Sequence, residues 1–268
     1  MSSILNDIVI RKRKDLIELK KRFPIHRLKK AVEGMDRLPR RGFKKAISQP
    51  KKLNLICEIK KASPSAGVIR EDFQPLRIAS MYEHAGAAAI SVLTEPFFFK
   101  GRPSYLKTVR QVTQLPLLRK DFLFETYQIY ETVLLDADAY LLIASLLTDE
   151  ELKNLIQIGK NFDMDALVEV HTEEDLKKAI HCGAEIIGIN NRNLKTLEVD
   201  VNFSKKMLSH IPEGVIKIVE SGLKTHDQLV DYKTLGADAF LIGTSLMKSD
   251  DIVGAVQSFL GTDKKFIK

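Results

Sequence analysis

Acid and base side chains stand at the ends of several short hydrophobic runs in this chain of 268 residues. The ones whose types suit proton transfer are Glu58, Lys60, Lys120, Glu169 and Glu220. A lysine can protonate a carbonyl oxygen, and a carboxylate across from it can accept or return a proton. A fold that brings these groups together would therefore hold the machinery for general acid–base chemistry on a small molecule.

Two later segments combine glycine with a hydroxyl side chain, a pattern typical of phosphate binding. Ser221-Gly222 follows the seventh hydrophobic run, and Gly243-Thr244 follows the eighth. Glycine lets the backbone amides approach an anion closely, and the hydroxyl groups donate to it. Barrel enzymes often bind phosphate in these two loops, so we expect a phosphate cradle here.

Eight hydrophobic runs rich in β-branched residues must position these side chains. They span residues 53–59, 88–93, 116–119, 139–143, 166–170, 186–189, 216–219 and 239–242. A stretch of helical period follows each run, and strands that are apolar on both faces and separated by helices form parallel sheets. Eight such units predict an α/β fold of the (β/α)8 TIM barrel type, with the active site at the carboxyl ends of the strands. An open, doubly wound sheet is the structural alternative.

Alternation along the strands sorts the neighbouring residues by face. Glu58 and Lys60 share one face, and Cys57 lies on the other, where we expect it to pack among the surrounding helices. The same rule places His171 on the face of Glu169, where it lines the rim or, as we favour, is an ordinary surface histidine. The histidines show no His-x-His or His-Glu-x-x-His spacing, so we predict no metal site.

Residues 1–50 are predicted to form two or three extra helices that cover one end of the barrel, within a single domain of residues 1–268 whose barrel spans 51–268. Residues 1–52 hold 17 Lys or Arg against 5 Asp or Glu, whereas the whole chain has a net charge of only +7. Such a basic segment is also typical of a nucleic-acid-binding arm.

We favour a helix with a solvated basic face over such an arm. The apolar residues Ile4, Ile8, Leu16 and Leu19 are spaced to share one face. That arrangement leaves the basic residues largely in water, namely Arg11, Lys12, Lys14 and Lys21.

Targeting and redox signals point to a cytoplasmic protein. We find no signal-peptide pattern and no run of eighteen apolar residues, so we expect neither secretion nor a membrane span. The two cysteines, Cys57 and Cys182, lack Cys-x-x-Cys spacing and are expected to be reduced thiols.

Over nearly all of residues 50–248 the sequence resembles the indole-3-glycerol phosphate synthase family in the order and spacing of its motifs. The most specific stretch is Glu58-Ile59-Lys60-Lys61-Ala62-Ser63-Pro64-Ser65, which is similar to the family's Glu-x-Lys-x-x-Ser-Pro-Ser signature. Supporting motifs are Leu118-Arg119-Lys120-Asp121-Phe122, Leu167-Val168-Glu169-Val170-His171, Gly188-Ile189-Asn190-Asn191-Arg192, Val219-Glu220-Ser221-Gly222 and Leu241-Ile242-Gly243-Thr244-Ser245.

The resemblance implies a carboxy-lyase of tryptophan biosynthesis. Its substrate would be 1-(2-carboxyphenylamino)-1-deoxyribulose 5-phosphate, which the enzyme closes, decarboxylates and dehydrates to indole-3-glycerol phosphate. Lys120 matches the general acid that protonates the substrate ketone, and Glu169 matches the residue of the dehydration step. Lys60 matches the lysine near the substrate carboxylate.

The remaining matched residues orient the reactants. Glu58, Asn190 and Glu220 match residues that hold the other groups of the site. The positions that match the surroundings of the substrate are Ser63, Phe99, Ser221, Gly222, Gly243 and Thr244, of which the last four lie toward its phosphate.

We expect no cofactor, because the protonated, cyclised intermediate can take up the electrons left by carbon dioxide. A catalytic lysine among other cations and apolar walls is expected to have its pKa lowered toward neutral pH. The partner is then an anionic sugar phosphate, with no nucleic acid and no membrane, and the chain is expected to be a monomer or a weak homodimer.

Two other functions compete with this hypothesis. A phosphoribosylanthranilate isomerase would share the phosphate cradle, but it would need only one acid and one base. A barrel that has lost activity and binds nucleic acid through its basic arm would show salt-sensitive binding to RNA or DNA.

Overall fold

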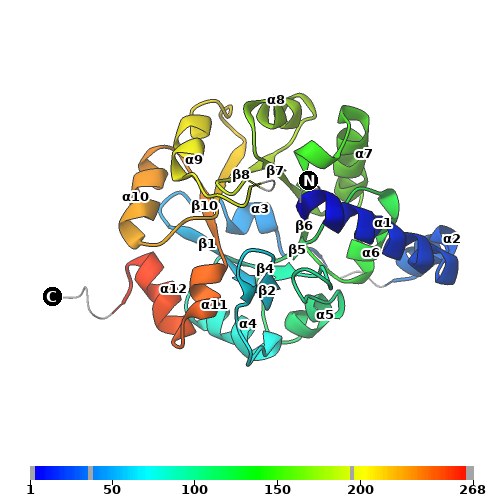
Figure 1. The fold of residues 1–268 in the computed structure, drawn as a ribbon, viewed down its shortest axis with the longest axis horizontal. Coiled ribbons are helices and arrows are strands. Elements are labelled where there is room, and N and C mark those ends of the chain that lie inside the picture. The colour runs from blue at the N-terminus through cyan, green and yellow to red at the C-terminus, as the bar shows by residue number, and fades with distance from the viewer. Residues whose placement is uncertain (1–3, 36–38, 194–195, 264–268) are drawn as a thin grey trace.

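The structure is a computed structural model that describes residues 4–35, 39–193 and 196–263. Eight parallel strands pair in the order β1-β10-β9-β8-β7-β6-β5-β4, and β1 also pairs with β4 to close the ring (Figure 1). The predicted TIM barrel is therefore confirmed, and the open sheet is excluded. No helix among the described residues is both long enough and apolar enough to cross a membrane.

Each predicted hydrophobic run coincides with a barrel strand to within one residue at either end. The strands are β1 (Asn54–Ile59), β4 (Ala89–Leu93), β5 (Leu117–Lys120), β6 (Ala139–Ile143), β7 (Asp165–Val170), β8 (Ile186–Asn190), β9 (Ile216–Glu220) and β10 (Ala239–Ile242). A short hairpin of β2 (Ala62–Ser63) and β3 (Gly67–Val68) follows β1. Lys120, Asn190 and Glu220 are the last residues of their strands, because the ladder of paired backbones continues past the apolar run.

Helices surround the strands (Figure 1). Those before the barrel are α1 (Ile4–Arg22), α2 (Ile25–Glu33) and α3 (Phe43–Ala46). Those within and after it are α4 (Pro75–His84), α5 (Ser104–Arg110), α6 (Thr126–Leu134), the 3₁₀ turn η1 (Ala144–Leu146), α7 (Asp149–Lys160), α8 (Glu173–His181), α9 (Val201–Leu208), α10 (His226–Thr234), α11 (Thr244–Lys248) and α12 (Ile252–Leu260). Thr172 and Thr225 cap α8 and α10 by accepting backbone N–H groups of the first turn.

Alternation of side chains divides the strands between two hydrophobic cores. The first lies between the strands and the helices and contains Cys57, whose side chain is fully buried. Burial raises the pKa of the Cys57 thiol, which makes it a packing residue as predicted. The second core fills the barrel interior with residues such as Ile56, Leu118 and Ile218.

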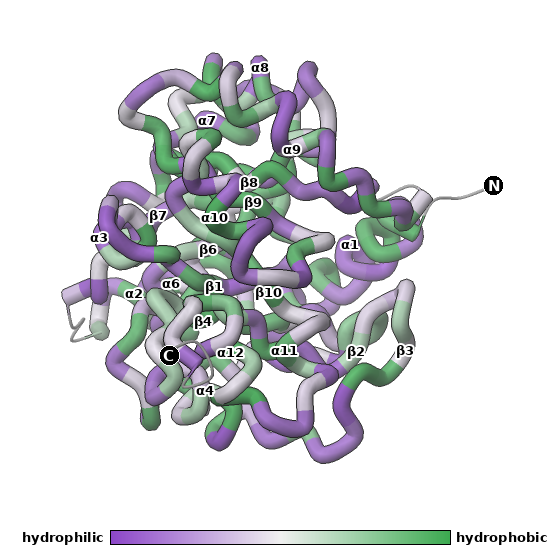
Figure 2. Tube along the Cα trace, turned by 90° about the vertical axis from the view of Figure 1, so that its left-hand side faces the viewer, coloured by the Kyte–Doolittle hydropathy of each residue, from purple (hydrophilic) through white to green (hydrophobic). Residues whose placement is uncertain are grey.

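The helix α3 closes the amino end of the barrel. Phe43 and the following Ile47 are fully buried in the interior core. The backbone N–H of Lys44 donates to the carboxylate of Asp165, the first residue of β7, at 2.8 Å. The prediction that the leading segment covers one end is therefore incomplete, because α3 lies at the end opposite to α1 (Figure 2).

The helix α1 covers the carboxyl end of the barrel. Leu5, Ile8 and Leu16 are its buried residues, whereas Leu19 is 36% exposed. The predicted apolar face was therefore wrong at Leu19, which points away from the barrel. Ile4 is partly buried against the interior core.

Lys12 corrects the prediction that the basic residues of α1 lie in water. Its Nζ lies 2.6 Å from Oδ1 of Asp121, and only 13% of the Lys12 side chain is exposed. Asp121 is buried and also pairs with the fully buried Arg119. Burial alone would raise the pKa of Asp121, but Lys12 and Arg119 outweigh it and lower this pKa to about 2. An ion pair therefore fixes α1 to the residue that follows β5.

Candidate functional site

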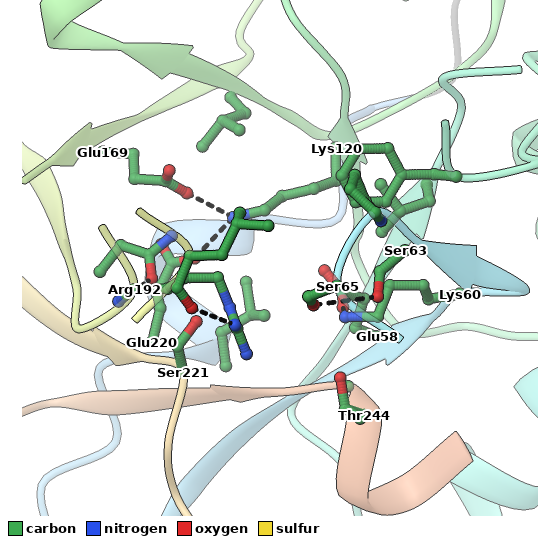
Figure 3. Close-up of a pocket in the computed structure, with 18 of the residues that line it drawn as sticks. Glu58, Lys60, Ser63, Ser65, Lys120, Glu169, Arg192, Glu220, Ser221 and Thr244 are labelled. Atoms are coloured by element: carbon green, nitrogen blue, oxygen red, sulfur yellow. Dashed lines mark hydrogen bonds and ion pairs between the residues drawn. The ribbon is translucent and has the colours of Figure 1, made fainter. Parts of the chain in front are cut away.

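The carboxyl ends of the strands and α1 enclose a cavity of about 180 Å³ (Figure 3). The structure brings all of the residues singled out by the sequence to its walls. They are Glu58, Lys60, Ser63, Phe99, Lys120, Glu169, Asn190, Glu220, Ser221, Gly222, Gly243 and Thr244. The cavity is the place where these side chains can act on one molecule, although their individual roles stay predictions.

Lys120 lies between two carboxylates (Figure 3). Its Nζ is 2.7 Å from Oε2 of Glu169 and 2.5 Å from Oε2 of Glu220. The three side chains come from β5, β7 and β9, and the alternation of inward positions turns all of them into the barrel mouth. The Lys120 side chain is 12% exposed and both carboxylates are nearly fully buried, so the cluster interacts with little screening by water.

The pKa of Lys120 is raised, contrary to the prediction from the sequence. Burial by itself would lower this pKa, but the carboxylates of Glu169, Glu220 and Glu58 outweigh burial. The prediction placed the lysine among cations, whereas the fold surrounds it with anions. Lys120 is therefore held in its charged form in the substrate-free cavity.

The two carboxylates beside Lys120 differ in proton affinity. Burial would raise the pKa of Glu169, but Lys120 and His171 overcome it and hold this pKa well below its ordinary range. Burial raises the pKa of Glu220 to about 7, with Lys120 opposing the shift and Glu169 adding to it. The cluster thus contains an ionised carboxylate and one that binds a proton near neutral pH.

Glu58 and Lys60 form a second ion pair on the wall of the cavity. Nζ of Lys60, the residue that follows β1, lies 2.5 Å from Oε2 of Glu58, as expected from their predicted position on one face. Gly243 makes room for this pair, because a Cβ at that position would overlap the Glu58 carboxylate and touch Nζ of Lys60. The glycine after β10 therefore serves the ion pair, a function that the sequence did not indicate.

The loop after β9 is bent by two consecutive residues with left-handed backbones. Ser221 has φ of 66° and Gly222 has φ of 78°. The side-chain amide of Asn191 donates to the carbonyl oxygen of Ser221 at 3.0 Å and thereby ties this loop to the end of β8. A non-glycine residue in this conformation is strained, and such strain is common at ligand-binding loops.

Phe99 reaches the cavity because Glu95 organises the loop after β4. Its carboxylate accepts the backbone N–H groups of Phe97, Phe98 and Phe99 at 2.7–3.0 Å. The carbonyl oxygen of Phe99 in turn accepts the N–H of Ala62, which precedes Ser63 in the hairpin. Glu95 is therefore a structural carboxylate, unlike the charged residues at the neighbouring strand ends.

Several lining residues escaped the sequence interpretation. Ile4, Leu5 and Ile8 of α1 give the cavity an apolar wall, whereas the helical spacing of Ile4 and Ile8 indicated only that they are buried and Leu5 was not singled out. Arg192 also lines the cavity, and its guanidinium donates to the carbonyl oxygen of Leu197 at 2.8 Å. Its place two residues after the end of β8 was the signal that could have identified it.

His171 is largely enclosed by the protein, which corrects the prediction of a surface histidine. Only 10% of its side chain is exposed, and Nε2 lies 3.1 Å from Oε1 of Glu169. Within the described part of the chain, no group of three or more His, Cys, Asp or Glu side chains is arranged to hold a metal ion.

Comparison with known proteins gives a full-length similarity. The family model described as indole-3-glycerol phosphate synthase matches residues 5–259. A protein of that name from Sulfurimonas denitrificans is 46% identical over 255 residues, which cover 95% of this chain and 97% of the relative. Another of that name, from Campylobacter fetus, is 45% identical over 258 residues, with 96% and 99% covered.

Solved structures are similar in fold at low sequence identity. A 3-hexulose-6-phosphate synthase from Salmonella typhimurium aligns with a TM-score of 0.64 at 12% identity and covers 80% of this chain and 100% of its own. A thiamine phosphate pyrophosphorylase from Pyrococcus furiosus aligns with a TM-score of 0.59 at 16% identity, covering 82% and 99%. This likeness shows the barrel fold alone.

Proposed function

The chain belongs to the indole-3-glycerol phosphate synthase family and is a carboxy-lyase of tryptophan biosynthesis, and we propose on this premise that Lys120 is its general acid. The observation that carries the proposal is the position of the Lys120 ammonium between Glu169 and Glu220 inside the cavity. Membership of this family also sets aside the isomerase alternative.

In the proposed first step Lys120 protonates the ketone oxygen of the substrate while the aromatic ring carbon attacks the ketone carbon. The surrounding carboxylates raise the pKa of Lys120 and keep it charged in the substrate-free cavity. The ketone oxygen of the substrate then replaces a carboxylate as the hydrogen-bond acceptor and receives the proton. The bond to the substrate carboxyl group then breaks, carbon dioxide leaves, and the electron pair returns to the ring system. No oxidant or reductant enters this step.

In the proposed second step Glu169 accepts the proton released during dehydration. The hydroxyl group of the carbinol carbon leaves as water with a proton from Glu220, and the neighbouring carbon gives its proton to Glu169. Glu169 suits this role because its low pKa leaves it ionised and able to accept. Glu220 binds a proton near neutral pH and is the group we propose to hold the reacting hydroxyl, with Asn190 beside it in the β8–β9 ladder.

Lys60, Ser63 and Phe99 are proposed to bind the aromatic half of the substrate. Lys60 would pair with the substrate carboxylate, and Glu58 holds its ammonium in place. Phe99, together with Leu5 and Ile8 of α1, offers an apolar surface for the ring. Removing that ring from water adds to affinity in proportion to the area buried.

We place the substrate phosphate in the loops after β9 and β10, at Ser221, Gly222, Gly243 and Thr244. Inorganic phosphate should then compete with the substrate, and Thr244→Val should weaken this inhibition because it removes a hydroxyl donor at nearly constant volume. Thr234→Val is the matched control, since Thr234 is exposed on α10. Equal inhibition constants in both variants would move the phosphate elsewhere.

The direct test of function is turnover. The purified protein should convert the carboxyphenylamino-deoxyribulose phosphate to a product with indole fluorescence and should leave phosphoribosylanthranilate unchanged. Absence of the fluorescent product at saturating substrate would contradict the proposal.

We also propose that the chain works in the cytoplasm as a single domain, as a monomer or weak homodimer, without binding nucleic acid. The ion pair between Lys12 and Asp121 and the burial of Phe43 support one domain, because both tie the leading segment to the barrel. Sedimentation over a range of concentrations tests the oligomeric state. Salt-sensitive binding of RNA by the pure protein would contradict the absence of nucleic acid.

A further inference from the structure

Glu169 presents its two carboxylate oxygens to two different basic side chains. Oε2 lies 2.7 Å from Nζ of Lys120, and Oε1 lies 3.1 Å from Nε2 of His171. His171 is two residues beyond Glu169 and directly follows β7, and the two side chains meet at the end of this strand. We propose that His171 is a positioning residue for Glu169, which keeps this carboxylate oriented and ionised when Lys120 gives up its proton.

The surroundings of His171 indicate an interaction through charge. The Nε2–Oε1 approach has the distance of an ion pair without the alignment of a hydrogen bond. Nδ1 is buried and meets no hydrogen-bond partner among the described residues. The backbone N–H of His171 donates to Asp175 of α8 at 3.1 Å, which fixes the segment that carries the ring. A neutral imidazole would gain little from this position, whereas an imidazolium is attracted to Glu169.

The charged groups with the largest influence on His171 are carboxylates. They are Glu169 of β7, Asp175 on α8 and Glu220 on β9, and Lys120 of β5 lies on the far side of Glu169. Burial by itself would lower the pKa of His171, but these carboxylates outweigh it and raise the pKa. His171 therefore binds its proton more tightly than an imidazole in water does.

The consequence for the reaction follows from the order of proton transfers. Once Lys120 has donated its proton to the substrate, it no longer neutralises Glu169, and an isolated buried carboxylate would bind a proton itself. The imidazolium form of His171, paired with the other oxygen of Glu169, would oppose that protonation. This inference rests on the proposed function, because it assumes that Glu169 must accept a proton in the second step.

The first experiment compares the pH dependence of kcat in three variants with that of the wild type. His171→Gln keeps a polar side chain of similar reach without the charge, and His171→Leu removes both. His26→Gln is the matched control, since His26 is exposed on α2. Without the imidazolium, the pKa of Glu169 rises, so the acid limb of kcat should move to higher pH by about one unit or more in both His171 variants.

The plateau kcat and the KM of the two His171 variants distinguish a positioning role from a purely structural one. His171→Gln should retain a plateau kcat closer to the wild type than His171→Leu does, and KM should change little in either variant. The inference would be overturned if both His171 variants lost only thermal stability while the acid limb of their kcat profile stayed at the pH of the wild type.

The second experiment does not depend on turnover. The histidine ring signals of the substrate-free protein are titrated by NMR in the wild type and in Glu169→Gln. The pKa of His171 should fall in Glu169→Gln, because burial is then opposed by fewer carboxylates. An unchanged titration would overturn the ion pair. If the wild type fails to turn over the substrate while this titration behaves as expected, the proposed function fails and the pairing of His171 with Glu169 stands.

Discussion

At the carboxyl end of the barrel, Lys120 and its carboxylates face a cavity, whereas at the amino end the carboxylate of Asp138 is enclosed by donors. Oδ1 of Asp138 accepts the N–H of Arg41 at 2.9 Å, and Oδ2 accepts the N–H of Leu117 at 2.7 Å. Arg110 pairs with the same carboxylate. Both ends therefore contain buried charges, but the Asp138 carboxylate is enclosed by donors of the fold, whereas Lys120 and its carboxylates line a cavity that a ligand can enter.

The two ends differ in the partners of their charged side chains. At the amino end Asp138, Asp165 and Asp238 accept backbone N–H groups at the starts of strands and of α3, so their hydrogen bonds are used within the fold. At the carboxyl end the ionised groups pair mainly with one another. Charge that is satisfied by the backbone stabilises the barrel, and charge that is satisfied by neighbouring side chains can be redirected to a substrate.

The largest expected effect is the loss of turnover in Lys120→Met. Removing the proposed general acid should lower kcat by about 10²–10⁴-fold, because the ketone is no longer protonated as the ring closes. The midpoint of thermal unfolding should stay close to that of the wild type. Steady-state kinetics by indole fluorescence check this, with Lys107→Met, an exposed lysine of α5, as the control. Near wild-type turnover would remove Lys120 from the mechanism.

At the amino end, Asp138→Ala should lower the stability of the protein and leave its turnover nearly unchanged. The variant leaves Arg110 and two backbone N–H groups without their carboxylate, so the free energy of unfolding should fall by about 3–5 kcal/mol. The kcat of the folded protein should stay close to that of the wild type. Denaturant unfolding and kinetics measure the two quantities, with the exposed Asp231→Ala as the control. A selective loss of kcat without loss of stability would break the contrast between the two ends.

A smaller effect is expected in the pH dependence of stability. The pKa of Glu220 is raised from 4.5 to about 7, so between these values the folded protein holds a proton that the unfolded chain has lost. This group therefore lowers the free energy of unfolding as pH rises, by at most about 1.4 kcal/mol per pH unit. Glu220→Gln should remove this contribution. Urea unfolding at pH 5, 6 and 7 measures how the free energy of unfolding changes with pH in the wild type and in Glu220→Gln. The same pH dependence in both proteins would contradict the shifted pKa.

The smallest predicted effect concerns the ion pair that holds α1 over the cavity. Lys12→Met removes the partner of Asp121 and should raise KM about fivefold, or about 1 kcal/mol, because α1 is less firmly held. The kcat at saturation should change less than KM. Lys14→Met is the control, since Lys14 is exposed on the same helix. Equal KM values in the two variants would show that Asp121 does not fix α1 for substrate binding.

The barrel and the location of the candidate site could be predicted from local patterns in the amino-acid sequence. Strands that are buried on both faces leave a continuous apolar run, and helices leave a period of 3.6 residues, so both signals are local. Since the eight strands are parallel, the polar residues at their carboxyl ends must meet at one end of the barrel. This is why residues as far apart as Glu58 and Thr244 could be assigned to one cavity before the structure was known.

The partner of each side chain and the direction of its pKa shift follow from the packing of distant segments and could not be predicted from the sequence. Lys120 and Glu220 are separated by 100 positions in sequence, and Lys12 and Asp121 by 109, so no local pattern records either pair. The sequence therefore failed on the direction of the pKa shift of Lys120, on the burial of Lys12 and on the place of His171. A pKa depends on the net charge and burial within a few ångströms of a group, and that environment exists only after distant strands and helices have packed together.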